Sequence, residues 1–144
     1  MMKLGTVLFL LCGAILGAGH VAADMDVRRG GSLWARIEAG GAIRIDGRLA
    51  GYFEDDGAVR KDGSLVGKIE PDGAIRRGGS LVGAIEPDGT FRRGGSIIGR
   101  IASDGTIRKD GSLWGSVSEC CNDHEAMRKV AAVLVFFDAG YFKD

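Results

Sequence analysis

The sequence is poor in the residue types that most often reveal a function. Its 144 residues include two prolines, two histidines and three cysteines, and aromatic residues make up 7% of them. An excess of charge is also missing, because 19 lysine and arginine residues balance 19 aspartate and glutamate residues. Nucleic-acid-binding proteins carry a basic excess on one face. We therefore expect no nucleic-acid partner, and no strong attraction to an acidic membrane surface.

Long hydrophobic segments are also missing, except at the N-terminus. Residues 4–18 form an apolar run of 15 residues (18 − 4 + 1), preceded by Lys3 and followed by small residues at 21–23. This order is typical of a signal peptide, and the run is shorter than the roughly 20 residues of a membrane span. We predict that residues 1–23 are removed. The mature chain would then begin at Asp24, be secreted or periplasmic, and not span the membrane.

Glycine is abundant, and the 25 glycines follow an internal repeat. A unit of 16 residues (43 − 27) occurs six times, and its copies begin at Val27, Ile43, Val59, Ile75, Phe91 and Ile107. We number the positions of each copy from zero at these residues. Positions 0, 6 and 10 are apolar in every copy, as Ile75, Leu81 and Ile85 are in the fourth. Alternation between positions 6 and 10 predicts a strand with one buried face. We therefore expect these 18 side chains (three in each of six copies) to form the core.

Two turns are predicted in each copy. Residues 87–89, Pro-Asp-Gly, have the pattern of a three-residue hairpin loop, with a type I turn followed by a left-handed glycine. Residues 77–79, Arg-Gly-Gly, are treated in the same way. The two registers agree with each other because both set apolar residues opposite one another. The predicted pairs are Ile85 with Phe91 and Ile75 with Leu81.

These turns predict an all-β fold, an antiparallel meander that alternates strands of about seven and about three residues. Glycine at position 8 is expected where the long strand bends or where backbones crowd. Repeated bending would curl the meander into a pseudo-symmetric ring, or flower, of hairpins without free sheet edges. Closure would set Val27 opposite Val117 and bring Trp34 and Trp114 together at the seam. The alternative is that each tryptophan covers apolar surface on its own.

The repeat domain, residues 24–121, is followed by a segment of different pattern, residues 122–144. Asn122 and Glu125 have the spacing of a capping box. Helical spacing then relates Met127, Val130, Ala131, Leu134 and Phe137. We predict a helix over residues 123–137, apolar most of the way round and therefore buried. It would pack on the ring and cover its centre; a strand over residues 133–137 is the alternative.

The repeat, with its pattern Gly-x-Ile-x-x-Asp-Gly-x-[Ile/Val/Phe]-Arg, and residues 128–137 (RKVAAVLVFF) together resemble the bacterial 5-fold β-flower proteins. The resemblance, which includes the signal peptide, implies a ring of β-hairpins and a secreted or periplasmic location. It implies no activity and no catalytic residues. Five hairpins are complete around loop glycines, and a sixth would require the outer strands to pair by closure. The loop glycines are Gly41, Gly57, Gly73, Gly89 and Gly105.

Position 1 is arginine in every copy and forms our candidate anion-binding column: Arg28, Arg44, Arg60, Arg76, Arg92 and Arg108. A ring of guanidinium groups is suited to carboxylates or an anionic polymer. The alternative, which we favour, is ion pairing with glutamate at position 11, which our register places diagonal to the next arginine. Such exposed pairs are individually weak. The glutamates are Glu38, Glu54, Glu70 and Glu86.

No catalytic or metal-binding group is evident. The aspartates before the loop glycines lack the spacing of calcium loops, and we interpret them as turn residues. They are Asp56, Asp72, Asp88 and Asp104. Serine at position 5 recurs in five copies, which indicates a structural role rather than a single nucleophile. His124 is the sole histidine after residue 23 and has no spaced cysteine pairs for a zinc site. We therefore predict no cofactor, no metal and no enzymatic activity.

Cys120 and Cys121 remain in the mature chain. In an oxidising compartment they have three fates: a vicinal disulfide, a bond to another chain, or the reduced state. Adjacent cysteines rarely bond to each other, so we favour a disulfide-linked homodimer if they are exposed.

We interpret the chain as a binding or scaffold module with an envelope or extracellular partner. A lectin-like glycan-binding module is one alternative, and a cell-wall hydrolase with paired carboxylates is another. A glycan site in each repeat would require an aromatic platform that recurs with the period. Tyr52, Phe53, Trp34 and Trp114 do not recur in every copy, which argues against the lectin.

Overall fold

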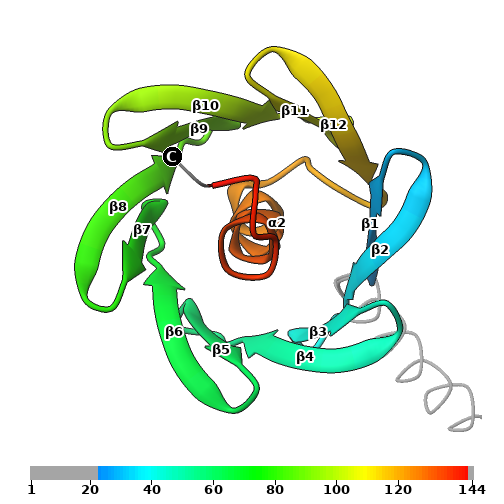
Figure 1. Cartoon of the computed structure of the whole chain (residues 1–144), viewed down its shortest axis with the longest axis vertical. Helices are drawn as coiled ribbons and strands as arrows, with labels where there is room; N and C mark the ends of the chain where they lie inside the picture. The colour runs from blue at the N-terminus through cyan, green and yellow to red at the C-terminus, as the bar shows by residue number, and fades with distance from the viewer. Residues whose placement is uncertain (1–22, 143–144) are drawn as a thin grey trace, which may run out of the picture.

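The computed structural model describes residues 23–142. The predicted signal peptide, residues 1–23, lies outside the described residues except for Ala23, and its removal stays a prediction. Twelve antiparallel strands form a closed barrel of six hairpins around one helix, α2 (Figure 1). The strands are β1 (Met25–Arg29), β2 (Ser32–Ile37), β3 (Ala42–Ile45), β4 (Arg48–Phe53), β5 (Ala58–Lys61), β6 (Ser64–Ile69), β7 (Ala74–Arg77), β8 (Ser80–Ile85), β9 (Thr90–Arg93), β10 (Ser96–Ile101), β11 (Thr106–Lys109) and β12 (Ser112–Val117).

The ring closes as predicted, and the outer strands complete a sixth unit. β1 pairs with β12, and Val27 lies opposite Val117. At this seam the rings of Trp34 and Trp114 meet edge to face, with their centroids 5.8 Å apart. Figure 1 shows the hairpins arranged as petals around α2, which is seen end-on at the centre. Closure leaves no strand of the sheet with an unpaired edge.

The barrel core consists of positions 0 and 10 of each copy. Ile85 lies opposite Phe91, which confirms the predicted register at residues 87–89. Gly89 has a φ of 92°, in the left-handed region that the turn requires. All 12 side chains at these two positions (two in each of six copies) are at most 5% exposed. They are Val27, Ile37, Ile43, Phe53, Val59, Ile69, Ile75, Ile85, Phe91, Ile101, Ile107 and Val117.

The predicted register at residues 77–79 is wrong. Gly78 and Gly79, with φ of 59° and 88°, form a two-residue turn, and Arg77 lies opposite Ser80. Positive φ at both central residues is the geometry of a type I′ hairpin turn. A bulge then shifts the register, so that Ile75 lies opposite Gly83 rather than Leu81. We call positions 1–6 the tip of each hairpin, and position 0 with positions 8–10 its base.

Because of this bulge, position 6 faces away from the core. Leu81 lies opposite Arg76 and is 62% exposed. The expected core of 18 side chains therefore contains only the 12 at positions 0 and 10. All six side chains at position 6 are between 49% and 68% exposed: Leu33, Leu49, Leu65, Leu81, Ile97 and Leu113.

Glycine at position 8 lies where backbones crowd, as predicted. A Cβ atom at Gly83 would collide with the carbonyl oxygen of Arg92 on the next strand and lie 2.8 Å from the ring of Phe142. A Cβ atom at three equivalent glycines would make the same two contacts, with a strand carbonyl and with an aromatic ring of the C-terminal segment. These are Gly51 against Phe137, Gly67 against Phe136 and Gly99 against Tyr141.

Helix α2 (His124–Phe136) fills the ring rather than covering it. Its N-cap is Asp123, one residue after the predicted Asn122, and the Asp123 side chain accepts a hydrogen bond from the backbone N–H of Ala126 at 2.7 Å. The five residues 130–134 are 0% exposed. The helix prediction is confirmed, and the alternative strand over residues 133–137 is wrong. Barrels of about eight strands are filled by their own side chains, so twelve strands leave room for a helix.

Polar contacts tie the C-terminal segment to the barrel. Arg128 is 8% exposed, and its Nη2 donates to the carbonyl oxygen of Ile69 at 2.6 Å. Burial lowers the pKa of this guanidinium. The hydroxyl of Tyr141 donates to the carbonyl oxygen of Arg108 at 2.6 Å, and burial raises the pKa of this phenol. The segment is therefore part of the folded core.

Candidate functional site

The predicted arginine column lies on the outer surface of the barrel. Four of its members form ion pairs with the glutamate six residues earlier, as the alternative interpretation predicted. In each pair the arginine Nε donates to Oε2 at 2.7–2.8 Å. The side chains are roughly one-third to two-fifths exposed, so each pair contributes at most about 1 kcal/mol. The pairs are Arg44–Glu38, Arg60–Glu54, Arg76–Glu70 and Arg92–Glu86.

The other two arginines, Arg28 on β1 and Arg108 on β11, lie on either side of β12. Position 11 is Ala102 in the fifth copy, six residues before Arg108, and Ser118 in the sixth copy, which adjoins the copy of Arg28 through closure. Within residues 23–142 neither arginine forms an ion pair. Arg108 also lies opposite Arg100 on β10, which adds a second positive charge there. The column is thus paired with glutamate in four copies and has no ion-pair partner within residues 23–142 on either side of β12.

Grooves between neighbouring hairpins repeat along the outer surface. One groove, of about 380 Å³, is lined by Leu81 of one hairpin and by Arg92 and the Gly94–Gly95 turn of the next. Its counterpart one copy earlier, of about 420 Å³, is lined by the equivalent Leu65 and Arg76. Each groove therefore combines an exposed aliphatic side chain with a guanidinium group.

A third groove, of about 450 Å³, lies at the first copy. It is lined by Leu33 and Arg44, and Trp34 adds an aromatic ring that the other two grooves lack. This set of three defines the outer grooves, our candidate functional site. They suit a partner that presents apolar groups beside hydrogen-bond acceptors.

The loop aspartates are turn residues, as predicted. In each, Oδ1 accepts a hydrogen bond from the backbone N–H two residues later, at 2.9–3.0 Å. The backbone N–H groups of Thr90 and Thr106 lower the pKa of Asp88 and Asp104, respectively. Across residues 23–142, no three His, Cys, Asp or Glu residues gather closely enough to hold a metal ion. Sequence and structure thus assign these carboxylates to the turns: Asp56, Asp72, Asp88 and Asp104.

His124 forms a structural hydrogen bond, and the repeated serines occupy equivalent positions at the starts of strands. The Nε2 atom of His124 donates to the carbonyl oxygen of Ile85 at 2.8 Å. The five serines at position 5 are the first residues of β2, β6, β8, β10 and β12.

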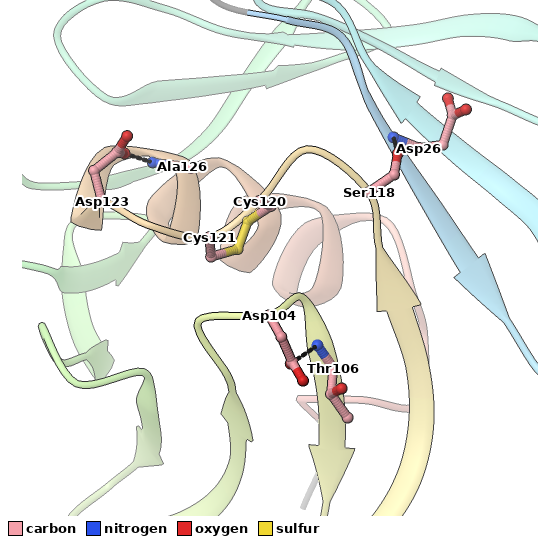
Figure 2. Close-up of a disulfide and its surroundings, with 8 residues drawn as sticks. All are labelled: Asp26, Asp104, Thr106, Ser118, Cys120, Cys121, Asp123 and Ala126. Atoms are coloured by element: carbon pink, nitrogen blue, oxygen red, sulfur yellow. Dashed lines mark hydrogen bonds between the residues drawn. A yellow bond between two sulfur atoms is a disulfide. The ribbon is translucent and has the colours of Figure 1, made fainter.

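Cys120 and Cys121 form a vicinal disulfide in the segment between β12 and α2 (Figure 2). Cys121 is 1% exposed, and its backbone N–H donates to the carbonyl oxygen of Ser103 at 2.8 Å. Both sulfur atoms are therefore bonded to each other within one chain. The disulfide-linked homodimer stays a prediction, and it would require this bond to be exchanged for one between chains.

In comparisons with known proteins, no family model, curated protein or solved structure matches the chain. The resemblance to 5-fold β-flower proteins therefore stays a prediction. None of the helices in the described part has the length and hydrophobicity needed to cross a membrane.

Sequence reasoning does not identify two sets of residues that line candidate sites. The side chains at position 6 were assigned to the core, although the Asp-Gly and Gly-Gly pairs at positions 3 and 4 are strong signals for a two-residue turn. The second set is at position 2, which is basic in five of six copies: Arg29, Lys61, Arg77, Arg93 and Lys109. Its recurrence was a signal, but the predicted three-residue turn placed this position in a loop, whereas the structure places it at the end of a strand.

Proposed function

We propose that this chain is a secreted or periplasmic binding or scaffold module, and not an enzyme. Its outer grooves would bind a macromolecular partner in the cell envelope or outside the cell. The observation that carries the proposal is the ring of six exposed aliphatic side chains at position 6. Single exposed apolar residues are normal, but a repeated arrangement indicates interaction more strongly than scattered residues do.

Repetition also favours a scaffold with several equivalent contacts. A single groove of this size gives weak binding. When several grooves are linked on one rigid barrel, binding at one groove raises the effective concentration of the partner at the next groove. The arginine in each groove is already paired with glutamate, so it supplies orientation through its remaining N–H groups rather than a net positive charge.

Site-specific photo-crosslinking tests this proposal. A photoreactive amino acid placed at Leu81 would be exposed to an envelope fraction, and the same amino acid at Glu125 would serve as control. Glu125 is exposed at the start of α2, away from the outer grooves. We expect a discrete crosslinked product from Leu81 that is lost when Leu65 is replaced by serine. Equal products from both sites, or none from Leu81, would exclude the outer grooves as the binding surface.

Two other functions are tested by separate assays. The groove with Trp34 is the feature that favours a lectin-like module, so binding on a glycan array that is lost in Trp34→Ala would support it. Turnover of peptidoglycan by the purified protein would support the hydrolase and contradict our assignment as a binding module.

Secretion is tested by mass spectrometry of the protein recovered from outside the cytoplasm. We expect a chain that begins at Asp24, because a short apolar run followed by small residues is the pattern that signal peptidase cleaves. An intact Met1 in that fraction would contradict the predicted location.

A further inference from the structure

A second candidate site, independent of the outer grooves, lies at the C-terminal end of α2. Neighbouring residues on a strand face opposite sides. Arginine at position 1 faces outward, so the basic residue at position 2 faces the barrel interior. There Arg77 lies over the rings of Phe136 and Phe142, with Cζ 5.6 and 5.8 Å from their centroids. Lys61 lies over the ring of Phe137, with Nζ 5.7 Å from its centroid.

Between these two cations is a pocket of about 480 Å³, which we call the inner pocket. Lys61 and Arg77 come from consecutive hairpins, and Phe136, Phe137 and Phe142 supply aromatic surface. Small-molecule sites commonly have volumes of about 300–1,000 Å³ and combine apolar walls with a few polar groups. The inner pocket has both properties.

The carboxylate that lines the inner pocket is not paired with Lys61 or Arg77. Asp138 is 9% exposed, and its Oδ1 accepts from Nη1 of Arg29 at 2.7 Å. Its Oδ2 accepts from the backbone N–H groups of Gly140 and Tyr141 at 3.1 and 2.7 Å. Both oxygen atoms are thus committed to other donors. Lys61 forms no hydrogen bond or ion pair within residues 23–142.

Support of the helix end explains only part of this arrangement. The last carbonyl groups of a helix lack partners within it and favour nearby cations. The last turn of α2 has no basic residue of its own, and Nη2 of Arg77 donates to the carbonyl oxygen of Val135 at 3.1 Å. Arg77 therefore stabilises the helix end. Lys61 does not share this role, because its contact is with a ring face.

We propose that the inner pocket binds a small anion, a carboxylate or a phosphate, that carries a flat apolar group. Its anionic end lies between Lys61 and Arg77, and its apolar end lies against the phenylalanine rings. An ammonium group and a guanidinium group are both strong donors to such anions. The aromatic surface selects against simple inorganic ions.

The test is an NMR titration of the ¹⁵N-labelled protein with four probes: benzoate, phenyl phosphate, acetate and the neutral benzamide. We expect benzoate or phenyl phosphate to shift the backbone resonances of residues 136–139, and acetate and benzamide to bind more weakly. The relative affinity of benzoate and phenyl phosphate shows whether the anion is a carboxylate or a phosphate. Lys61→Gln should weaken the preferred anion about fivefold to tenfold, as expected for loss of one charged donor.

The matched control is Lys68→Gln, which removes a lysine at position 9 that lines an outer groove instead. It should leave the affinity unchanged. Because Lys61 is exposed, Lys61→Gln is expected to fold normally, and unchanged dispersion of its spectrum would confirm this. The proposal is overturned if neither anion shifts these resonances, if benzamide binds as tightly as benzoate, or if Lys61→Gln binds as tightly as the unchanged protein.

Discussion

Ile85 and Leu81 lie four residues apart on β8, have the same number of carbon atoms, and end in opposite environments. Ile85, in the base of its hairpin, is 0% exposed, whereas Leu81, in the tip, is 62% exposed. On an uninterrupted strand both would face the core, because residues four apart lie on one side. The bulge between them reverses the face of the strand. One inserted residue thus converts half of a hydrophobic strand from core to outer surface.

The largest expected effect on stability comes from removing β1, the strand that closes the ring. Deleting Asp26–Arg29 removes most of β1 and the pairing of Val27 with Val117. We expect a loss of a few kcal/mol from burial and pairing. We also expect faster hydrogen exchange in residues 113–117, the last of which is 90 positions from Val27 (117 − 27). In an open repeat array the loss would stay in the first copy. Unchanged protection of residues 113–117 would mean that closure contributes nothing to stability.

The comparison itself is tested by truncating both side chains of β8. Ile85→Ala should reduce the free energy of unfolding by about 2–4 kcal/mol, because it leaves a cavity in the core. Leu81→Ala should change it by less than about 0.5 kcal/mol, as for most surface positions. Urea denaturation of the two variants measures both values. Similar losses would show that Leu81 is buried in solution and that the tip register is the predicted one after all.

Turn glycines extend the comparison to the ends of the strands. Gly89, in the turn next to the base, and Gly79, in the tip, both have positive φ. A Cβ at Gly89 would collide with the carbonyl oxygen of Ile101, whereas one at Gly79 meets nothing within 4 Å. Positive φ alone costs a β-branched residue about 1–2 kcal/mol. Gly79→Val should show that loss, and Gly89→Val a larger one.

Thr90→Val is the control for these two variants, because its shape is nearly unchanged and its backbone is in a strand. Thermal unfolding of all three gives the order. Melting temperatures that are equal for Gly89→Val and Thr90→Val would contradict the turn assigned to residues 87–89.

The smallest expected effect is at the outer surface. Ala102→Glu introduces at position 11 the glutamate that pairs with arginine in four other copies. We expect a gain of about 0.3–0.5 kcal/mol through Arg108, reduced by salt. A double-mutant cycle with Arg108→Gln isolates the pair, and Ala102→Gln controls for the side chain. A coupling energy of zero would mean that the arginine column is held by the strands and not by its glutamates.

Base and tip also differ in how far the sequence predicts them. Apolar residues at positions 0 and 10 and the Pro-Asp-Gly loop agree on one register, and the structure confirms it through Ile85 and Phe91. For the tip, a second register is also compatible with the sequence, the one that pairs Ile75 with Leu81. The hydrophobic pattern alone does not distinguish a three-residue loop from a two-residue turn plus a bulge. Only the left-handed preference of Gly-Gly and Asp-Gly pairs does so.

The candidate sites depend on that distinction. The arginine column and its glutamates were predicted because positions 1 and 11 lie outside the bulge on the outward face. The outer grooves and the inner pocket were not. Position 6 changes sides with the turn, and position 2 lies in the loop, not in a strand, in the predicted register. Packing of the C-terminal aromatic residues against Gly51, Gly67, Gly83 and Gly99 was also beyond the sequence pattern. This packing joins the repeats to a C-terminal segment that does not follow their period.

The helix inside the ring has a consequence for the order of folding. The barrel surrounds a segment that follows its last strand, and the strand that closes it is its first. The seam cannot form until β12 is available, and the central packing cannot form until α2 is available. Until then, hairpins that form locally have apolar inner faces that nothing covers. Contacts between residues distant in the sequence form late, because the entropy cost of closing the intervening loop comes before they form. A chain that crosses a membrane before folding would meet this requirement only after its C-terminal segment had followed the repeats across.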